Sequence, residues 1–238
     1  RNITGNPALA YGLIAASQQS GLPLFLGSYP ITPASDILHE LSKHKNFGVV
    51  TFQAEDEIAG IGAALGASYA GSLGVTTTSG PGVALKSETI GLAVSLELPL
   101  IIVDVQRGGP STGLPTSVEQ SDLLQAIYGS HGDAPRIVLA PRDVEDCFYI
   151  AMDACRLARK YSCPVIILSD QAISSRIEAF AEPDLDVHWV EPELNLVDPG
   201  ASFAPYPLDR TTRHAPPGTK LSAGKYPVVT GVEHDEWG

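Results

Sequence analysis

Apolar residues along the chain recur at two spacings, one typical of buried strands and one typical of helices. Short apolar runs of strand length predict strands at residues 23–27, 48–52, 74–78, 99–105, 136–140 and 163–168. Helical spacing between these runs predicts helices at residues 6–20, 35–44, 53–74, 83–96, 121–128 and 143–161. Strands that alternate with helices are typical of βαβ units. The predicted fold class is therefore α/β, with a doubly wound, mostly parallel sheet.

One predicted helix has an unusual composition. Residues 53–74, QAEDEIAGIGAALGASYAGSLG, begin with three acids and continue with small residues in two adjacent helical stripes. Each interior glycine costs about 1 kcal/mol relative to alanine, so Gly60, Gly62 and Gly66 need a compensating gain from packing. A second chain or a ligand would supply this gain, and an ordinary buried helix is the alternative. We expect one helix, packed on both sides, with a carboxylate at its N-terminus.

Two helix starts carry capping signals. Asn6 followed by Pro7 is typical of an N-cap and a first-turn proline. Thr32-Pro33 precedes the predicted helix that begins at Ser35, so Thr32 is a second candidate N-cap.

The character of the chain changes near residue 181. Prolines at 183, 192, 199, 205, 207, 216, 217 and 227 interrupt a stretch with little periodicity. Prolines of this frequency favour an extended linker. We therefore expect residues 1–180 to form one domain, and residues 181–238 to form an extended arm that leads to a further domain outside this chain.

Composition narrows the possible functions. The chain has 238 residues and a formal net charge of -12, which argues against a nucleic-acid partner. Neither a membrane-spanning run nor a secretory signal is visible, so we expect a cytoplasmic protein without a membrane partner. The three cysteines lack a C-x-x-C spacing and are interpreted as reduced core residues, so this chain alone would not hold an iron–sulfur cluster.

Four unusual segments follow predicted strands, at residues 28–33, 53–57, 79–82 and 106–116. Ligands of parallel sheets bind outside the carboxyl ends of the strands, so these segments predict one site. The glycine-rich phosphate motifs, H-E-x-x-H and G-x-S-x-G are absent from the sequence. We expect no metal site in this chain.

The segments together resemble the pyrimidine-binding domain of the 2-oxoacid:ferredoxin oxidoreductase family, which uses thiamine diphosphate. The resemblance rests on GNPALAYG (5–12), YPITPAS (29–35), QAEDEIAGIGAALGASYAG (53–71), TTTSGPG (76–82), QRGGPSTGLPT (106–116), EQSDL (119–123) and GVEHDEWG (231–238). These strings are most similar to alpha subunits of the members that act on 2-oxoglutarate. Ala34 and Ala54 depart from the family, which more often has Ser and Met at these positions.

The resemblance implies roles for individual residues. Glu57 would be the catalytic acid that exchanges a proton with the aminopyrimidine ring of the cofactor. Its position before the small-residue stripes matches the activating Glu of the family. Glu55 and Asp56 are alternatives, although acids in a first helical turn also stabilise the helix dipole.

Other residues would bind substrate or shape the cofactor pocket. Arg107 would bind the substrate carboxylate through paired donors, and Thr32 would donate a hydrogen bond to the substrate. Tyr29, Pro30 and Ile31 would line the pocket beside the pyrimidine ring. The turn from Ser79 and Gly80 to Gly82 would form a neighbouring wall of backbone.

The resemblance also implies partners. A beta subunit would carry the diphosphate and Mg²⁺ site, with its Gly-Asp-Gly motif, and the [4Fe–4S] cluster. The implied reaction is oxidative decarboxylation of a 2-oxoacid, favoured as 2-oxoglutarate, to an acyl-CoA thioester and CO₂, with electrons passed to ferredoxin. Three alternatives stay open: pyruvate or a branched-chain or aryl 2-oxoacid as substrate, another class of thiamine diphosphate enzyme, or a non-catalytic α/β interaction domain.

Overall fold

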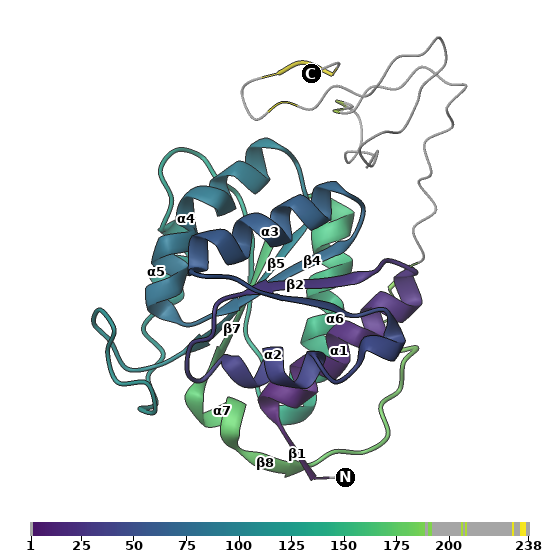
Figure 1. The fold of residues 1–238 in the computed structure, drawn as a ribbon, viewed down its shortest axis with the longest axis vertical. Helices are drawn as coiled ribbons and strands as arrows, with labels where there is room; N and C mark the ends of the chain where they lie inside the picture. The colour runs from purple at the N-terminus through teal and green to yellow at the C-terminus, as the bar shows by residue number, and fades with distance from the viewer. Residues whose placement is uncertain are drawn as a thin grey trace.

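A six-stranded parallel sheet lies at the centre of the computed structural model (Figure 1). The structure describes residues 2–188, 190–191, 206, 208, 230 and 234–236. In spatial order, the strands are β3 (Val50–Gln53), β2 (Leu24–Ser28), β4 (Leu73–Thr78), β5 (Leu100–Gln106), β7 (Pro164–Asp170) and β6 (Ile137–Leu139). Every pairing within this sheet is parallel, which confirms the predicted fold class.

Helices cover both faces of the sheet (Figure 1). One face carries α1 (Gly5–Ser20), α2 (Ser35–Leu41) and α6 (Val144–Tyr161), and the other carries α3 (Glu57–Tyr69), α4 (Gly80–Ser95) and α5 (Leu123–Tyr128). Successive residues of β5 enter opposite layers, because Ile101 belongs to the first core and Ile102 to the second. Burial on both faces explains why this strand is almost continuously apolar in sequence.

Glycines let α3 lie directly on the sheet. A Cβ atom on Gly27 of β2 would come within 2.3 Å of the Gly60 carbonyl oxygen. One on Gly74 of β4 would come within 2.4 Å of the Ala64 carbonyl oxygen. Any side chain at either position would therefore push the helix off the strands.

The small-residue helix differs from its prediction in length and in packing. It spans Glu57–Tyr69 rather than the whole of 53–74. In the described part of the chain, α3 packs on the sheet and against α4. On the other face, Ile58 is 54% exposed, and a Cβ atom on Gly62 or Gly66 would meet nothing within 4 Å. Packing on the second side stays a prediction about a partner.

Both predicted N-caps are wrong. The N-cap of α1 is Thr4, and the Asn6 side-chain amide instead donates a buried hydrogen bond of 2.8 Å to the Pro33 carbonyl. The N-cap of α2 is Ala34, which makes no side-chain capping bond, so the Thr32 hydroxyl does not cap this helix. The Pro33 carbonyl lies in the turn before α2 and is buried, so it needs a hydrogen-bond donor from the protein. The Asn6 amide supplies this donor and so links α1 to that turn.

Four short elements were not predicted. Strand β1 (Asn2–Thr4) pairs antiparallel with β8 (Ile177–Ala179), and α7 (Gln171–Ser175) directly follows β7. A pairing between segments so far apart in sequence leaves no local periodicity from which to predict it. One turn of 3₁₀-helix, η1 (Lys45–Phe47), follows α2 where a longer helix was predicted.

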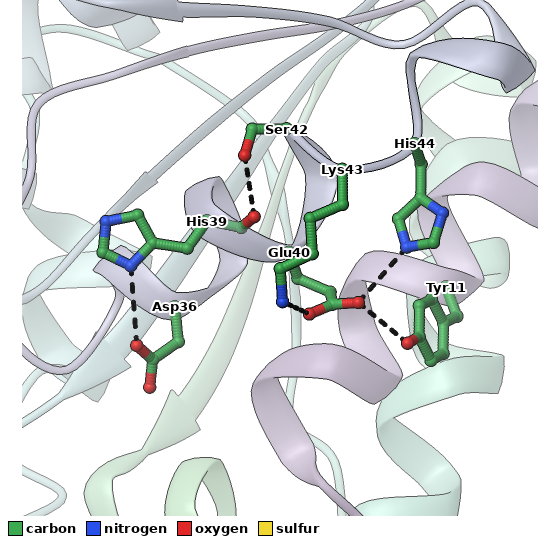
Figure 2. A network of polar contacts seen from close by, with 7 residues as sticks. All are labelled: Tyr11, Asp36, His39, Glu40, Ser42, Lys43 and His44. Carbon is green, nitrogen blue, oxygen red and sulfur yellow. Dashed lines mark hydrogen bonds and ion pairs between the residues drawn. The ribbon is translucent and has the colours of Figure 1, made fainter.

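A polar network joins α1 to α2 (Figure 2). The Glu40 carboxylate accepts hydrogen bonds from the Tyr11 hydroxyl at 2.8 Å and the Lys43 ammonium at 2.7 Å, and it lies 3.2 Å from His44 Nε2. Partial burial alone would raise the pKa of Glu40, but the hydrogen bonds from Lys43, Tyr11 and His44 outweigh it and lower the pKa to about 2. The ionised carboxylate therefore fixes the position of α2 on α1.

The first residues of the predicted arm lie along α1 and α6. Gln19 of α1 donates to the Leu185 carbonyl at 2.8 Å, and His188 lies 2.8 Å from the Asp153 carboxylate of α6. The domain boundary at residues 180 and 181 stays a prediction, since most of residues 192–238 lie outside the described residues. In the described part of the chain, no helix is long and apolar enough to span a membrane.

Candidate active site

The predicted site segments meet at one edge of the sheet, where the parallel strands end. Strand β2 ends at Ser28, and the Ser28 hydroxyl lies 2.7 Å from the Thr77 hydroxyl of the neighbouring strand β4. The end of β3 joins the same group, because the Ala54 amide donates to the Ser28 carbonyl at 2.9 Å. The edge is thus held together by polar contacts between strand ends.

Of the three acids before and at the start of α3, only Glu57 is turned into the protein. The N-cap is Asp56, whose carboxylate accepts a hydrogen bond of 2.7 Å from the Ala59 amide. Glu55 is exposed, whereas Glu57 is only 9% exposed. In the part of the chain that the structure describes, no hydrogen-bond donor contacts the Glu57 carboxylate. Its carboxyl group is therefore without a protein hydrogen-bond donor among these residues.

A buried lysine holds the backbone beneath this carboxylate. Lys86 of α4 is fully buried, and its ammonium donates to the Glu57 carbonyl at 2.8 Å and to the Thr76 hydroxyl at 3.1 Å. Burial lowers the pKa of Lys86 to about 8, although the charges of Glu57 and Asp56 oppose the shift. Lys86 was not predicted as a site residue. The one indication of its role in the sequence was a lysine in a predicted helix that consists mainly of apolar and small residues.

The turn before α4 forms a wall of backbone beside Glu57. Ser79 is the N-cap of α4, and its buried hydroxyl has no hydrogen-bond partner in the described structure. A Cβ atom on Gly82 would come within 1.9 Å of the Thr78 hydroxyl and 2.9 Å of Glu57 Cγ. Only glycine at position 82 therefore lets the first turn of α4 lie this close to the Glu57 side chain, whereas Gly80 lies against Asp122.

Arg107 and the turn at Thr32 form a second group of contacts. The Arg107 side chain is 5% exposed and donates to the backbone carbonyls of Thr32 and Thr112. Its Nε is buried and has no partner among the described residues. No hydrogen bond or ion pair links Arg107 to Glu57 in the described structure, so the two groups of contacts lie at the same edge without touching through polar atoms.

The remaining predicted residues surround the Thr32 turn. The Thr32 side chain is exposed at the surface of this chain, and Tyr29 is 38% exposed. Pro30 and Ile31 are half-buried, and Ile31 packs against the core under α1 and α6. Nothing in the described structure covers Thr32 and Tyr29, so both can contact a ligand.

The loop after Arg107 has its own hydrogen bonds. The Gly108 amide donates to the Ser117 carbonyl at 3.0 Å, and the Leu114 amide donates back to the Gly108 carbonyl at 2.7 Å. The Gly109 amide donates to the Glu119 carboxylate at 3.0 Å. The loop therefore presents Arg107 from a defined conformation.

Sequence analysis also missed a pair of acids below this loop. Asp104 of β5 is fully buried, and Asp122 at the start of α5 is 9% exposed. Burial raises the pKa of Asp104 well above its usual range, and the negative charge of Asp122 raises it further. The signal available in the sequence was a lone carboxylate in an otherwise apolar strand.

The chain matches one protein family over most of its length. The family model described as "Pyruvate flavodoxin/ferredoxin oxidoreductase, thiamine diP-bdg" matches residues 17–236. The chain is similar to the 2-oxoglutarate oxidoreductase subunit KorA of Mycobacterium tuberculosis, with 61% identity over 223 residues, 92% of this chain and 34% of that protein. It is 47% identical over 199 residues to the 2-oxoglutarate synthase subunit KorA of Archaeoglobus fulgidus, which covers 82% of this chain and 56% of that protein.

A solved structure has the same fold over the whole chain. The 2-oxoglutarate:ferredoxin oxidoreductase of Magnetococcus marinus, with 2-oxoglutarate, coenzyme A and succinyl-CoA bound, superposes with a TM-score of 0.89 at 42% sequence identity. The match covers 100% of this chain and 41% of that chain. The chain thus spans about a third to three fifths of the length of these relatives.

Proposed function

Because the chain belongs to the thiamine diphosphate-binding family of pyruvate flavodoxin/ferredoxin oxidoreductases, we propose that it supplies the pyrimidine side of the active site of a cytoplasmic 2-oxoglutarate:ferredoxin oxidoreductase. The observation that carries the proposal is the position of Glu57. It alone of three neighbouring acids is buried, and it faces a backbone wall built around glycine.

The residues at the edge of the sheet fit the pyrimidine end of the cofactor. A flat ring needs one carboxyl group free of protein donors and a neighbouring surface without side chains. Glu57 provides the first, and the first turn of α4, where Gly82 lies beside Glu57, provides the second. Ser79 and Gly80, at the start of the same turn, would contact the cofactor as well. Among the described residues, no cluster of three or more acidic, histidine or cysteine side chains could hold a metal ion.

Glu57 would act as the proton carrier. Thiamine diphosphate, when bound, would supply the nucleophilic carbon chemistry that the side chains of the protein lack. The Glu57 carboxyl would exchange a proton with a nitrogen of the aminopyrimidine ring, which requires contact within hydrogen-bond distance. Lys86 would hold the Glu57 backbone in place through its bond to the Glu57 carbonyl. Tyr29, Pro30 and Ile31 would exclude water from one side of the ring.

Arg107 would bind the carboxylate of the 2-oxoacid. Its guanidinium has five N–H donors, and the structure engages two terminal nitrogens with the carbonyls of Thr32 and Thr112. The buried, unpartnered Nε and the remaining N–H groups stay available to an anion. The exposed Thr32 hydroxyl would donate a second hydrogen bond to the substrate.

The proposed enzyme needs a beta subunit. That subunit would bind Mg²⁺ and the diphosphate, carry the [4Fe–4S] cluster and pass electrons to ferredoxin, with coenzyme A as the acyl acceptor. The unpacked face of α3, with Ile58 and Gly62, supports a contact with such a partner. The names of the Mycobacterium and Archaeoglobus relatives support 2-oxoglutarate as the substrate.

Substitution of Glu57 by Gln tests the proposal. In the assembled enzyme, we expect Glu57→Gln to lower kcat by at least roughly 100-fold, the scale of general acid–base catalysis, with folding and assembly preserved. Glu55→Gln is the matched control, because it removes an exposed carboxylate two residues away and should leave kcat unchanged. Turnover would be followed as reduction of ferredoxin with 2-oxoglutarate and coenzyme A.

The same assay separates the alternatives. Unchanged turnover in Glu57→Gln would contradict the proposed role and favour a non-catalytic interaction domain. A loss in Glu55→Gln instead would move the role to Glu55. Good activity on pyruvate, or on a branched-chain or aryl 2-oxoacid, with negligible activity on 2-oxoglutarate would change the substrate. Carboligase activity without ferredoxin reduction would indicate another class of thiamine diphosphate enzyme.

A further inference from the structure

Two carboxyl groups lie against each other beneath the Arg107 loop. Asp104 has no exposed surface, and both of its oxygens, like Asp122 Oδ2, are buried without a donor among the described residues. The pKa of Asp104 is raised first by burial and then by the charge and the hydrogen-bonding carboxyl group of Asp122, so the two carboxyl groups act on each other. Two carboxyls can share a hydrogen bond only if one of them carries a proton, because two ionised groups would repel each other.

Among the residues that the structure describes, no cation shifts the pKa of either group, so nothing there would allow both to ionise. Asp104 pairs in register with Thr78 of β4 and Leu168 of β7, and neither neighbour carries charge. The charged groups that act on the pair are acids, since Asp122 raises the pKa of Asp104 and Glu119 raises that of Asp122. Burial is the largest cause of both shifts.

Asp122 also lies at the point where three elements meet. A Cβ atom on Gly80 would come within 2.7 Å of both Asp122 carboxylate oxygens, so the carboxylate packs on the first turn of α4. A negative charge there is stabilised by the dipole of α4. The Asp122 amide donates to the Gln106 side-chain oxygen at 3.1 Å, which joins α5 to the end of β5.

These contacts close the base of the Arg107 loop. Gln106 immediately precedes Arg107, and Asp122 ends the segment that follows it. The loop therefore leaves and re-enters the fold at two residues that bond to each other. Asp104 lies two residues before Gln106 in β5, so the side chains of the two residues lie on the same face of the sheet.

We propose that Asp104 and Asp122 share one proton and act together as positioning residues, which hold the base of the 107–121 loop so that Arg107 faces the site. Asp104 is the donor and Asp122 is the acceptor. The link to Arg107 rests on the proposed function, whereas the shared proton does not. If the two side chains only filled space, their size would matter and the proton between them would not.

Infrared difference spectra of the assembled enzyme at neutral pH test the proton. The spectrum of the parent enzyme minus that of Asp104→Asn should show the carbonyl band of a protonated carboxyl. The matched control is Asp133→Asn, which removes an exposed aspartate from a loop and should show only the bands of an ionised carboxylate. If the difference spectrum for Asp104→Asn shows only the bands of an ionised carboxylate, the proposal is overturned. A cation bound between the two carboxylates in place of the proton would give this same result.

Hydrogen exchange tests the positioning role. The side-chain amide of Asn at position 104 can donate an N–H hydrogen bond to Asp122 at any pH. Asp104→Asn should therefore protect the amides of Gly108, Gly109 and Leu114 from exchange as the parent does. Asp104→Leu has a similar size but no donor, and should exchange these amides at least tenfold faster, with a KM for the 2-oxoacid raised at least tenfold and a smaller change in kcat. Equal protection in both variants would overturn the positioning role.

The two proposals can fail separately. If Glu57→Gln retains full turnover while the infrared and exchange results hold, the proposed function fails and the carboxyl pair stands. If Asp104→Asn shows ionised bands while Glu57→Gln abolishes turnover, the pair fails and the proposed function stands.

Discussion

Arg107 shows how one side chain can serve the fold and a ligand together. Its terminal nitrogens bond to the Thr32 and Thr112 carbonyls, and its Nε lies buried without a partner in the described structure. A guanidinium can do this because its five donors point outward in one plane. Lysine has one nitrogen at the end of a flexible chain, so it could not reach two carbonyls and also offer a paired surface to a carboxylate.

Replacement of Arg107 by Lys therefore has a defined expected result. The positive charge stays, but the planar set of donors is lost. We expect the KM for the 2-oxoacid to rise roughly 10- to 100-fold, equivalent to about 1.4 to 2.8 kcal/mol, with a smaller change in kcat. Steady-state kinetics of the assembled enzyme would measure both constants. A KM equal to that of the parent would mean that the carboxylate binds elsewhere.

At the scale of single elements, the link between α1 and α2 depends on one carboxylate (Figure 2). Glu40 of α2 accepts from Tyr11 of α1 and from Lys43 in the turn after α2, and its lowered pKa means that the folded state favours the ionised form. A group with a depressed pKa stabilises the fold above its unfolded pKa, and the stabilisation is lost as the pH falls through the folded pKa. For Glu40, the loss runs from a pH near 4.5 down to about 2.

Glu40→Gln should lower stability at neutral pH by about 0.5 to 1 kcal/mol, the range for a partly exposed charged group. The difference from the parent should shrink as the pH falls below 4.5 toward 2. Thermal unfolding at a series of pH values would measure it. Glu182→Gln, at an exposed position, serves as the control and should show no such trend. A difference between Glu40→Gln and the parent that stays constant with pH would contradict the assignment.

Sequence patterns predicted the periodic elements well and the contacts between distant residues poorly. The apolar run at 99–105 predicted β5 because burial on both faces leaves a direct trace in the sequence. The pairing of β1 with β8 leaves no such trace. The cap at Asn6 was wrong for a related reason, since the same side chain can cap a helix or bond to another element, and only the tertiary structure decides between them. The cap at Thr32 was wrong because α2 begins at Ser35, with Ala34 as its N-cap.

The position of the candidate site could be predicted from the sequence, but the contacts of its residues could not. Its location could be predicted, because parallel strands bring their carboxyl ends to one edge. That Glu57 rather than Glu55 is buried could not be read from three adjacent acids, since the choice depends on which residue is the N-cap. Asp104 and Asp122 are separated by a long loop, so their contact appears only when the loop closes.

At the scale of the whole molecule, the unpacked face of α3 requires a partner if the proposed function holds. Gly62→Arg tests this contact. Nothing lies within 4 Å of a Cβ atom there, and arginine favours a helix by about 1 kcal/mol over glycine, so folding should be retained. We expect co-purification with the beta subunit to fall at least tenfold.

The control places the same side chain on the other layer of the fold. Glu145→Arg lies at an exposed position of α6, across the sheet from α3, and should leave assembly unchanged. A normal yield of complex from Gly62→Arg would show that this face of α3 is not the contact.

The ladder between β1 and β8 has a mechanical consequence. Asn2 pairs with Ala179, so the chain enters and leaves the ladder at the same end. Once the contacts of Leu185 and His188 with α1 and α6 have broken, a force applied through the segments before residue 2 and after residue 179 would pull this pair apart first. Ile3–Glu178 and Thr4–Ile177 would then break in turn. Such unzipping loads one pair at a time, whereas shearing loads all pairs together. The six-stranded sheet would therefore be shielded from tension until this short ladder had opened.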